Sequence, residues 1–157
     1  MMMGVALRYC KNKQEAEDVL QDSFIQAFDK IKTYKNTGNL GAWLRKITLN
    51  KALELYRKKH KTPVLIELDK LEITLNNKEL EKLELNDLIN KIQQLPLGFK
   101  TVFNLYAVEG YNHREIGELL NISVGTSKSQ YSRARKMIQK MIIDEENTEK
   151  HLLKHAK

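Results

Sequence analysis

The stretch "NHREIGELLNISVGTSKSQYSRARKMI", Asn112 to Ile138, has the pattern of two helices joined by a tight turn. Asn112 can cap the first helix, and Glu115 three residues later completes a capping-box pattern. Gly117 supplies the small residue that is needed where the second helix crosses the first. Asn121 tolerates the left-handed backbone of the turn. This spacing predicts a helix-turn-helix.

The second helix of this motif is expected to have an apolar inner face and a polar, cationic outer face. The inner face is predicted to hold Val124, Tyr131, Ala134 and Ile138. The outer face is predicted to carry Thr126, Lys128, Ser129, Gln130, Ser132, Arg133 and Lys136. Such a face can meet base edges while hydroxyls, Lys and Arg hold phosphates. A solvated basic face on a helical hairpin is the alternative, because the pattern alone is only moderately specific.

A second basic surface is predicted on a helix from Leu40 to Lys59 and just beyond it. The cations in this region are Arg45, Lys46, Lys51, Arg57, Lys58, Lys59 and Lys61, and Glu54 is the one acid among them. Trp43 is interpreted as a core residue rather than a platform for base stacking. A charge run is usually only a solvated face. Two basic helical surfaces on one chain, however, indicate two DNA contacts.

The overall composition is that of a globular protein with an anionic partner. The chain has 157 residues and a net charge of +7, with 41% hydrophobic and 30% charged residues. No run of about 18 apolar residues occurs, so no membrane insertion is expected. The opening "MMMGVALRYC" is too short for a secretory signal. The single cysteine, Cys10, excludes an internal disulfide, suits a cytoplasmic location and is expected to be a small apolar residue at a helix end.

Helical spacing of apolar residues extends along most of the chain. A helix is expected from Gln14 to Lys32, capped by Asn12 with Glu15. Its core stripe is predicted to be Ala16, Val19, Leu20, Ser23, Phe24, Ala27, Phe28 and Ile31. Residues 33–39 read as a loop because Gly38 and polar residues interrupt the pattern. Further helices are expected before Pro96 and between Pro96 and Gly110.

Composition shifts after Lys61 to an acidic segment that begins with a proline. The helical spacing of apolar residues predicts an all-α fold, and this shift divides it into two small helical domains joined by an acidic linker. The first domain is expected to span residues 1–61 and the linker residues 62–78. A second domain of four short helices is expected over residues 79–143, followed by a polar tail over residues 144–157.

Three motifs in this order closely resemble the extracytoplasmic-function (ECF) group of bacterial RNA polymerase sigma factors, of the sigma-70 family. They are "NKQEAEDVLQDSFIQAF", "TGNLGAWLRKITLNKAL" and the stretch from "LPLGFK" to "RKMI". The resemblance covers about residues 7–141. It implies a promoter-melting helical domain and a helix-turn-helix domain that reads the upstream promoter element. Relatives carry residues before the first helix that are missing here, so the chain is expected to be shortened at its amino end.

The resemblance also implies roles for individual residues. The surface that grips the clamp helices of core RNA polymerase corresponds to Glu17, Asp18, Gln21 and Asp22. The minus-ten element is implied to meet Asn39, Arg45, Lys46, Asn50 and Arg57. The minus-thirty-five element is implied to meet Thr126, Lys128, Ser129, Gln130, Ser132, Arg133 and Lys136. Ser127 and Gln130 depart from the valine and arginine that are commoner in the family, which leaves the promoter sequence open.

The expected function is therefore promoter-specific transcription initiation without any bond being made or broken. The expected partners are core RNA polymerase, through its clamp helices and flap, promoter DNA, and in some family members an anti-sigma protein. A helix-turn-helix regulator that is dimeric and independent of polymerase is the first alternative. A helical adaptor that uses its charge only for protein contacts is another.

An enzyme is the remaining alternative. His151 and His155 lie one helical turn apart, which resembles the spacing of zinc ligands. The glutamate of a metalloprotease motif is missing between them, and no phosphate loop or nucleophile elbow is visible in the sequence. No catalytic residue, metal or cofactor is therefore expected.

Overall fold

The computed structural model describes residues 2–34, 38–59 and 85–155, and these ranges contain helices and turns without strands. The elements in chain order are α1 (Met2–Tyr9), α2 (Lys13–Lys30), the short 3-10 helix η1 (Ile31–Thr33), α3 (Leu40–Lys59), α4 (Leu85–Gln94), α5 (Leu97–Phe103), the π-helical turn η3 (Asn104–Val108), α6 (His113–Leu120) and α7 (Val124–His155). The all-α prediction is confirmed. The predicted linker, residues 62–78, lies outside the described residues.

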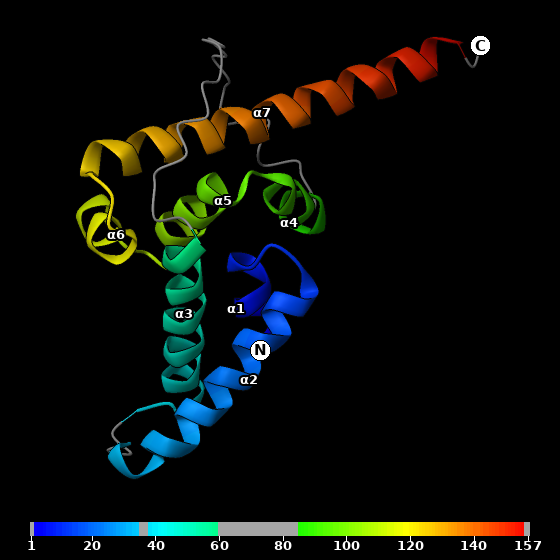
Figure 1. The fold of residues 1–157 in the computed structure, drawn as a ribbon. Helices are drawn as coiled ribbons and strands as arrows, with labels where there is room; N and C mark the ends of the chain where they lie inside the picture. Colours follow the sequence, from blue (N-terminus) through cyan, green and yellow to red (C-terminus); the bar gives the residue numbers. More distant parts are fainter. Residues whose placement is uncertain (1, 35–37, 60–84, 156–157) are drawn as a thin grey trace.

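In the N-terminal half, residues 2–59, α2 and α3 form an antiparallel hairpin and α1 packs beside one end of it (Figure 1). The predicted cap of α2 is confirmed, since Asn12 Oδ1 accepts the Glu15 amide at 2.9 Å. The returning bond differs from a strict capping box, because Glu15 Oε2 accepts the amide of Lys11 at 3.1 Å. Cys10 is buried directly after α1, as predicted.

The predicted core stripe of α2 is only half right. Ala16, Val19, Ser23 and Ala27 are buried. Leu20 is half-buried, Phe24 and Ile31 are exposed, and Phe28 is 74% exposed. Figure 1 shows the reason: α1 covers the hairpin only near the start of α2, so no third described helix lies over its far end. The periodicity was a correct sign of a helix and an incomplete guide to burial.

In the C-terminal half, residues 85–155, the turn between α6 and α7 has the predicted chemistry. Asn112 and Glu115 form a complete capping box at the start of α6. Asn121 has φ 56°, in the left-handed region. A Cβ on Gly117 would lie 2.9 Å from the backbone oxygen of Ile122, so only glycine fits where the chain turns back. Gly110, with φ 79°, ends the preceding helix as predicted.

The last helix is longer than the sequence suggested. α7 runs for 32 residues, and Figure 1 shows it crossing the whole C-terminal half and continuing past it. The prediction of four short helices is therefore wrong for this one. The segment predicted as a polar tail, from residue 144, continues this helix as far as His155.

The buried core joins the two halves of the chain. Its larger cluster draws on α1, α2 and α3 from one half and on α5, η3 and α6 from the other. The residues of this shared cluster include Val5, Ala6, Tyr9, Leu49, Ala52, Leu53 and Tyr56 from the N-terminal half, and Val102, Leu105, Ile116 and Leu120 from the C-terminal half. A second cluster lies within the C-terminal half, around Leu95, Phe99, Ala134, Ile138 and Ile142. The sequence-based division into domains stays a prediction, and the two regions it separates pack together.

Candidate nucleic-acid interface

The outer face of α7 presents most of the polar residues that the sequence assigned to it. Ser123 caps the helix, since its Oγ accepts the Thr126 amide at 2.9 Å and lies 2.8 Å from Thr126 Oγ1. The exposed members of the predicted set are Lys128, Ser129, Ser132 and Lys136, and the partly exposed ones are Thr126 and Arg133. Hydroxyl groups and cations therefore share one solvent-facing surface, as phosphate and base contacts require.

Gln130 is the exception, because it faces inward. Its side chain lies beside Gly98 of α5, and the residue is only 9% exposed. Its Oε1 is buried without a hydrogen-bond partner among the described residues. Val124, predicted to face inward, is instead 42% exposed. The predicted placement of these two residues is wrong, because the polarity of a side chain does not show which face of α7 the neighbouring helices cover.

The inner stripe of α7 instead begins with a buried serine. Among the described side chains of α7, the buried positions are Ser127, Gln130, Ala134, Ile138 and Ile142, at steps of three and four residues. Ser127 is satisfied by His113 of α6, whose Nδ1 lies 3.0 Å from the serine Oγ. Burial, followed by the positive charge of Lys128, lowers the pKa of His113 below its ordinary value.

Aromatic rings reinforce this contact between α6 and α7. The ring of His113 stacks on Tyr106 with centroids 4.5 Å apart, and Tyr131 lies 4.5 Å from Tyr106. Phe103 stacks on Tyr131, with ring centroids 5.8 Å apart. This cluster holds the outer face of α7 in a fixed orientation. The sequence had no local signal for it, because its members come from four elements, α5, η3, α6 and α7.

The second predicted DNA surface lies on α3 and the turn before it. Asn39 directly precedes α3, and its Oδ1 accepts the Gly41 amide at 2.7 Å. Lys46, Asn50 and Arg57 are exposed along the helix. Of the loop predicted to capture a base, residues 35–37 lie outside the described residues.

Trp43 packs against the flank of this loop. Its ring lies 5.3 Å from that of Tyr34, at 47°. The hydroxyl of Tyr34 donates a hydrogen bond to the carbonyl of Gly38. Trp43 is partly buried against Tyr34, which agrees with its interpretation as a core residue.

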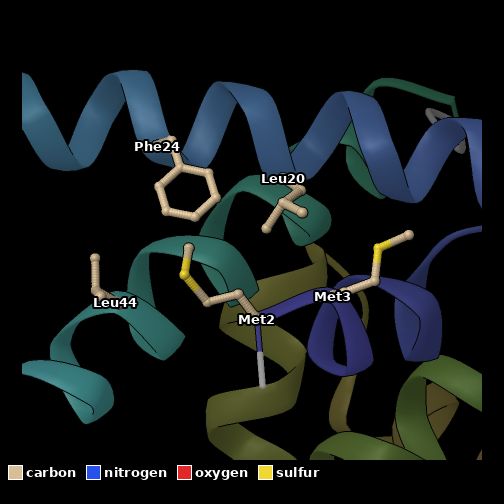
Figure 2. A pocket seen from close by; sticks show the side chains of 5 residues that line it. All are labelled: Met2, Met3, Leu20, Phe24 and Leu44. Atoms are coloured by element: carbon tan, nitrogen blue, oxygen red, sulfur yellow. The ribbon is translucent and has the colours of Figure 1, made fainter.

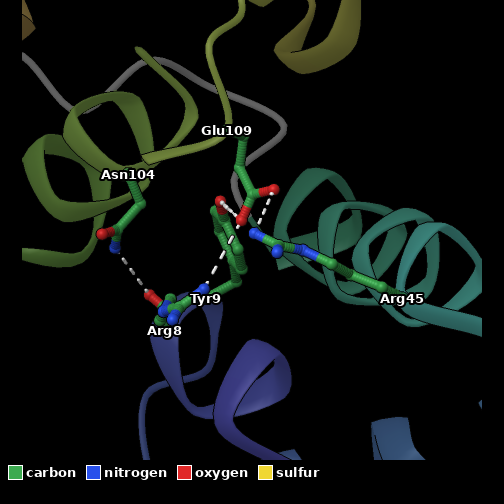
Figure 3. A network of polar contacts seen from close by, with 5 residues as sticks. All are labelled: Arg8, Tyr9, Arg45, Asn104 and Glu109. Atoms are coloured by element: carbon green, nitrogen blue, oxygen red, sulfur yellow. Dashed lines mark hydrogen bonds and ion pairs between the residues drawn. The ribbon is translucent and has the colours of Figure 1, made fainter. Parts of the chain in front are cut away.

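Arg45, also assigned to the minus-ten element, is occupied by the other half of the chain (Figure 3). Its Nη2 donates to Glu109 Oε2 at 2.8 Å. Glu109 also lies 3.6 Å from Arg8 Nη1 and accepts from the hydroxyl of Tyr9 at 3.4 Å. Burial, and then the charge of Glu109, raise the pKa of Tyr9. Nothing in the local sequence marked Glu109 as a functional residue.

The predicted polymerase-binding residues lie together on the exposed side of α2. Glu17, Asp18, Gln21 and Asp22 are all exposed. Glu17 pairs with Lys13 at 3.5 Å across one helical turn. This surface is negatively charged, which suits ion pairing with arginines of a partner, and the exposed Ile25 lies one helical turn after Gln21 and Asp22.

A separate apolar groove of about 460 Å³ lies beside this surface (Figure 2). Met2, Met3, Leu20, Phe24 and Leu44 line it, from α1, α2 and α3. Figure 2 shows the ring of Phe24 and the sulfur-bearing chain of Met2 turned toward the same space. Exposed apolar surface of this kind marks protein contacts in soluble proteins.

The described ranges contain no group of three or more His, Cys, Asp or Glu side chains that could hold a metal ion. The side chains of His151 and His155 lie outside the described residues. Among residues 2–34, 38–59 and 85–155, no helix combines the length and apolar character needed to cross a bilayer.

Comparison with known proteins finds two family matches in chain order. The family described as "Sigma-70 region 2" matches residues 1–62, and the family described as "Sigma-70, region 4" matches residues 85–138. The ECF RNA polymerase sigma factor SigW of Bacillus subtilis is 31% identical over 150 residues, which cover 87% of this chain and 80% of SigW. The RNA polymerase sigma factor SigV of the same organism is 28% identical, covering 90% of this chain and 84% of SigV.

A solved structure has a similar fold. The sigma factor RpoE in its co-crystal structure with the anti-sigma factor NepR from Bartonella quintana aligns with a TM-score of 0.52. The alignment covers 91% of this chain and 89% of RpoE, at 23% sequence identity. At this identity the likeness concerns the fold alone.

Proposed function

Because this chain belongs to the ECF group of the sigma-70 family of RNA polymerase sigma factors, we propose that the outer faces of α3 and α7 contact two separate promoter elements. The chain functions in promoter-specific transcription initiation. The observation that carries the assignment of residues is the pair of exposed, cationic helix faces on one chain. A polymerase-independent regulator is not favoured, because matches to both region 2 and region 4 occur in one chain.

The outer face of α7 contacts the minus-thirty-five element in this proposal. Lys128 and Lys136 hold phosphates, and Ser129 and Ser132 lie between them on the exposed face. Thr126 and Arg133 flank this surface. Gln130 belongs to the set proposed from the sequence, but reaching a base edge requires its side chain to leave the contact with Gly98.

The minus-ten element contacts α3 and its preceding turn. Lys46, Asn50 and Arg57 are exposed and available to a single strand. Asn39 contributes through the turn that it caps, and Arg45 contributes once it is released from Glu109. Flipping a base out of the stack costs about a few kcal/mol, which such contacts must offset.

Core RNA polymerase binds the acidic side of α2 through Glu17, Asp18, Gln21 and Asp22. Their exposure, and the negative charge of Glu17, Asp18 and Asp22, support this assignment. An anti-sigma protein is a further partner by analogy with RpoE, whose structure contains one. The chain makes and breaks no bond, and it acts in the cytoplasm, where bacterial promoters are transcribed. The chain contributes binding energy and places the polymerase at the promoter.

The test is transcription in vitro with core polymerase on genomic promoter fragments, with and without the purified chain. We expect transcripts with new, defined start sites only when the chain is present. Unchanged start sites, with a folded chain that does not associate with core polymerase, would refute the proposal. A dimer that binds a palindromic site without polymerase would support the regulator instead.

A further inference from the structure

A buried carboxylate ties the two halves of the chain together. The side chain of Glu109, directly after η3, is only 8% exposed, and an acid is rarely buried unless it is paired. Within the part of the chain that the structure describes, its carboxylate contacts side chains of the N-terminal half: Arg45 from α3 at 2.8 Å, and Arg8 and Tyr9 from α1 at 3.6 and 3.4 Å. Figure 3 shows these side chains converging on Glu109 from two helices.

Hydrogen bonds at the end of α1 extend the same interface. The last carbonyls of a helix have no partner within it. Asn104 Nδ2 donates to the carbonyl of Arg8 at 3.3 Å, and Lys100 Nζ donates to that of Cys10 at 3.3 Å. Burial lowers the pKa of Lys100. The C-terminal half therefore satisfies polar groups of α1 directly.

The position of Glu109 matters because of what Arg45 is proposed to do. A guanidinium binds a carboxylate and a phosphate through the same N–H donors. The 2.8 Å bond from Arg45 Nη2 to Glu109 uses a donor that a DNA phosphate would otherwise accept from. A carboxylate and a phosphate at this site therefore compete for the same group.

We infer that Glu109, Arg45, Arg8 and Tyr9 form an autoinhibitory latch between the two halves of the free chain. With the latch closed, Glu109 takes the place of a DNA phosphate on Arg45 and keeps α1 and α3 against η3. Release of Glu109 frees Arg45 for a nucleic-acid backbone. The inference rests on the proposed role of Arg45 in the minus-ten contact.

The shared apolar cluster explains why such a latch needs only one carboxylate. Residues such as Leu53 and Leu105 already hold the halves together by apolar contact. The ion pairs of Glu109 then favour one relative arrangement of the halves over others. Removing the charge of Glu109 leaves two arginines beside a neutral amide. The closed arrangement then loses its electrostatic advantage, and the open arrangement becomes more populated.

The test compares Glu109→Gln with Glu118→Gln in the full chain. Glu118 also belongs to the C-terminal half and makes an ion pair, with Arg114 at 3.6 Å, but its side chain is 72% exposed. Both variants change the net charge equally. The probe is a fluorescein-labelled single strand of 20 random nucleotides, followed by fluorescence anisotropy at fixed salt.

Glu109→Gln is expected to bind this strand about three- to tenfold more tightly than wild type, as loss of a partly buried ion pair would allow. Glu118→Gln is expected to change affinity by less than about twofold, because exposed pairs contribute little. Adding Arg45→Ala to Glu109→Gln should remove most of the gain. Small-angle scattering should show a larger radius of gyration for Glu109→Gln than for Glu118→Gln.

Equal affinity and equal radius of gyration for the Glu109 and Glu118 variants would overturn the latch. So would a gain that survives Arg45→Ala, because it would not depend on unmasking this residue. If Glu109→Gln fails to fold by circular dichroism, Glu109→Asp replaces it, since the shorter side chain draws the carboxylate back from Arg45. For Glu109→Asp, a gain smaller than tenfold but above the Glu118→Gln value supports the latch, and no gain overturns it.

Failure of the latch can be told apart from failure of the proposed function. If wild-type chain and core polymerase produce defined transcripts while Glu109→Gln binds the single strand no better than Glu118→Gln, only the latch is wrong. If Glu109→Gln gains affinity through Arg45 but no variant directs transcription, the latch stands and the proposed function fails.

Discussion

Gly117 shows how one missing side chain sets the geometry of the helix-turn-helix. The carbonyl of Ile122 approaches so closely that a Cβ on Gly117 would lie 2.9 Å from it. The amide of Ile122 in turn donates to the carbonyl of Gly117 at 3.0 Å. Asn121 takes the left-handed conformation between them. The angle between α6 and α7 therefore depends on a backbone-to-backbone contact that no larger residue permits.

Replacing Gly117 by Ala is expected to destabilise the chain by about 1–3 kcal/mol, because the clash is with backbone that cannot move aside easily. Urea denaturation followed by circular dichroism measures the change. Gly125→Ala is the control, since its Cβ would meet only Ser123 Oγ at 3.7 Å and alanine favours the helix. Equal stability of the two variants would contradict the steric argument.

At the scale of elements, α2 combines two kinds of surface along one helix. Its exposed acids make a polar face, while Phe24 and Phe28 leave apolar groups uncovered. The buried residues between them, such as Val19 and Ala27, attach the helix to α1 and α3. Substitutions on the exposed polar face can therefore be made without opening the core.

Gln21→Ala combined with Asp22→Ala is expected to abolish binding to core polymerase while leaving the fold intact. The loss follows from removing an acid and its polar neighbour from a surface proposed to pair with arginines. Pull-down of core polymerase measures binding, and circular dichroism checks the fold. The control is Gln14→Ala with Asp29→Ala, which changes the same residue types at exposed positions of the same helix. Full binding by a folded Gln21/Asp22 variant would refute the assignment.

At the scale of the whole molecule, the two halves share one hydrophobic cluster. Leu53 from α3 and Leu105 from η3 are both fully buried in it. The polar contacts of Glu109, Asn104 and Lys100 lie around the same contact between halves. Each half therefore depends on the other to bury part of its apolar surface. When the halves separate, the apolar surface that each of them buries in this contact must be covered by another contact.

Leu53→Ala is expected to lower stability by about 2–5 kcal/mol and to weaken amide protection in both halves. Because the cluster is shared, faster hydrogen exchange should appear in α5 and η3 as well as in α3. Ile138→Ala, in the cluster within the C-terminal half, is the control and should leave exchange in α1 to α3 unchanged. Faster exchange confined to α3 and its neighbours in Leu53→Ala would mean that the halves are independent.

The sequence by itself determined the caps and turn residues at several helix ends, because these depend on residues a few positions apart. Asn12 and Asn112 as caps, Gly110 as a stop and Asn121 in the turn all appear as predicted. The range of α3 was also predicted correctly, as Leu40–Lys59. Local hydrogen bonding and steric rules are sufficient for such features.

Only the tertiary structure decided which polar groups face inward and which charges meet. Gln130 and Ser127 are buried because α5 and α6 lie against α7, and polarity within one helix cannot reveal its neighbours. The pairing of Arg45 with Glu109 joins residues that are 64 positions apart. Such contacts arise from packing between elements, and neither helical periodicity nor net charge carries information about which distant residue will lie within 3 Å of another.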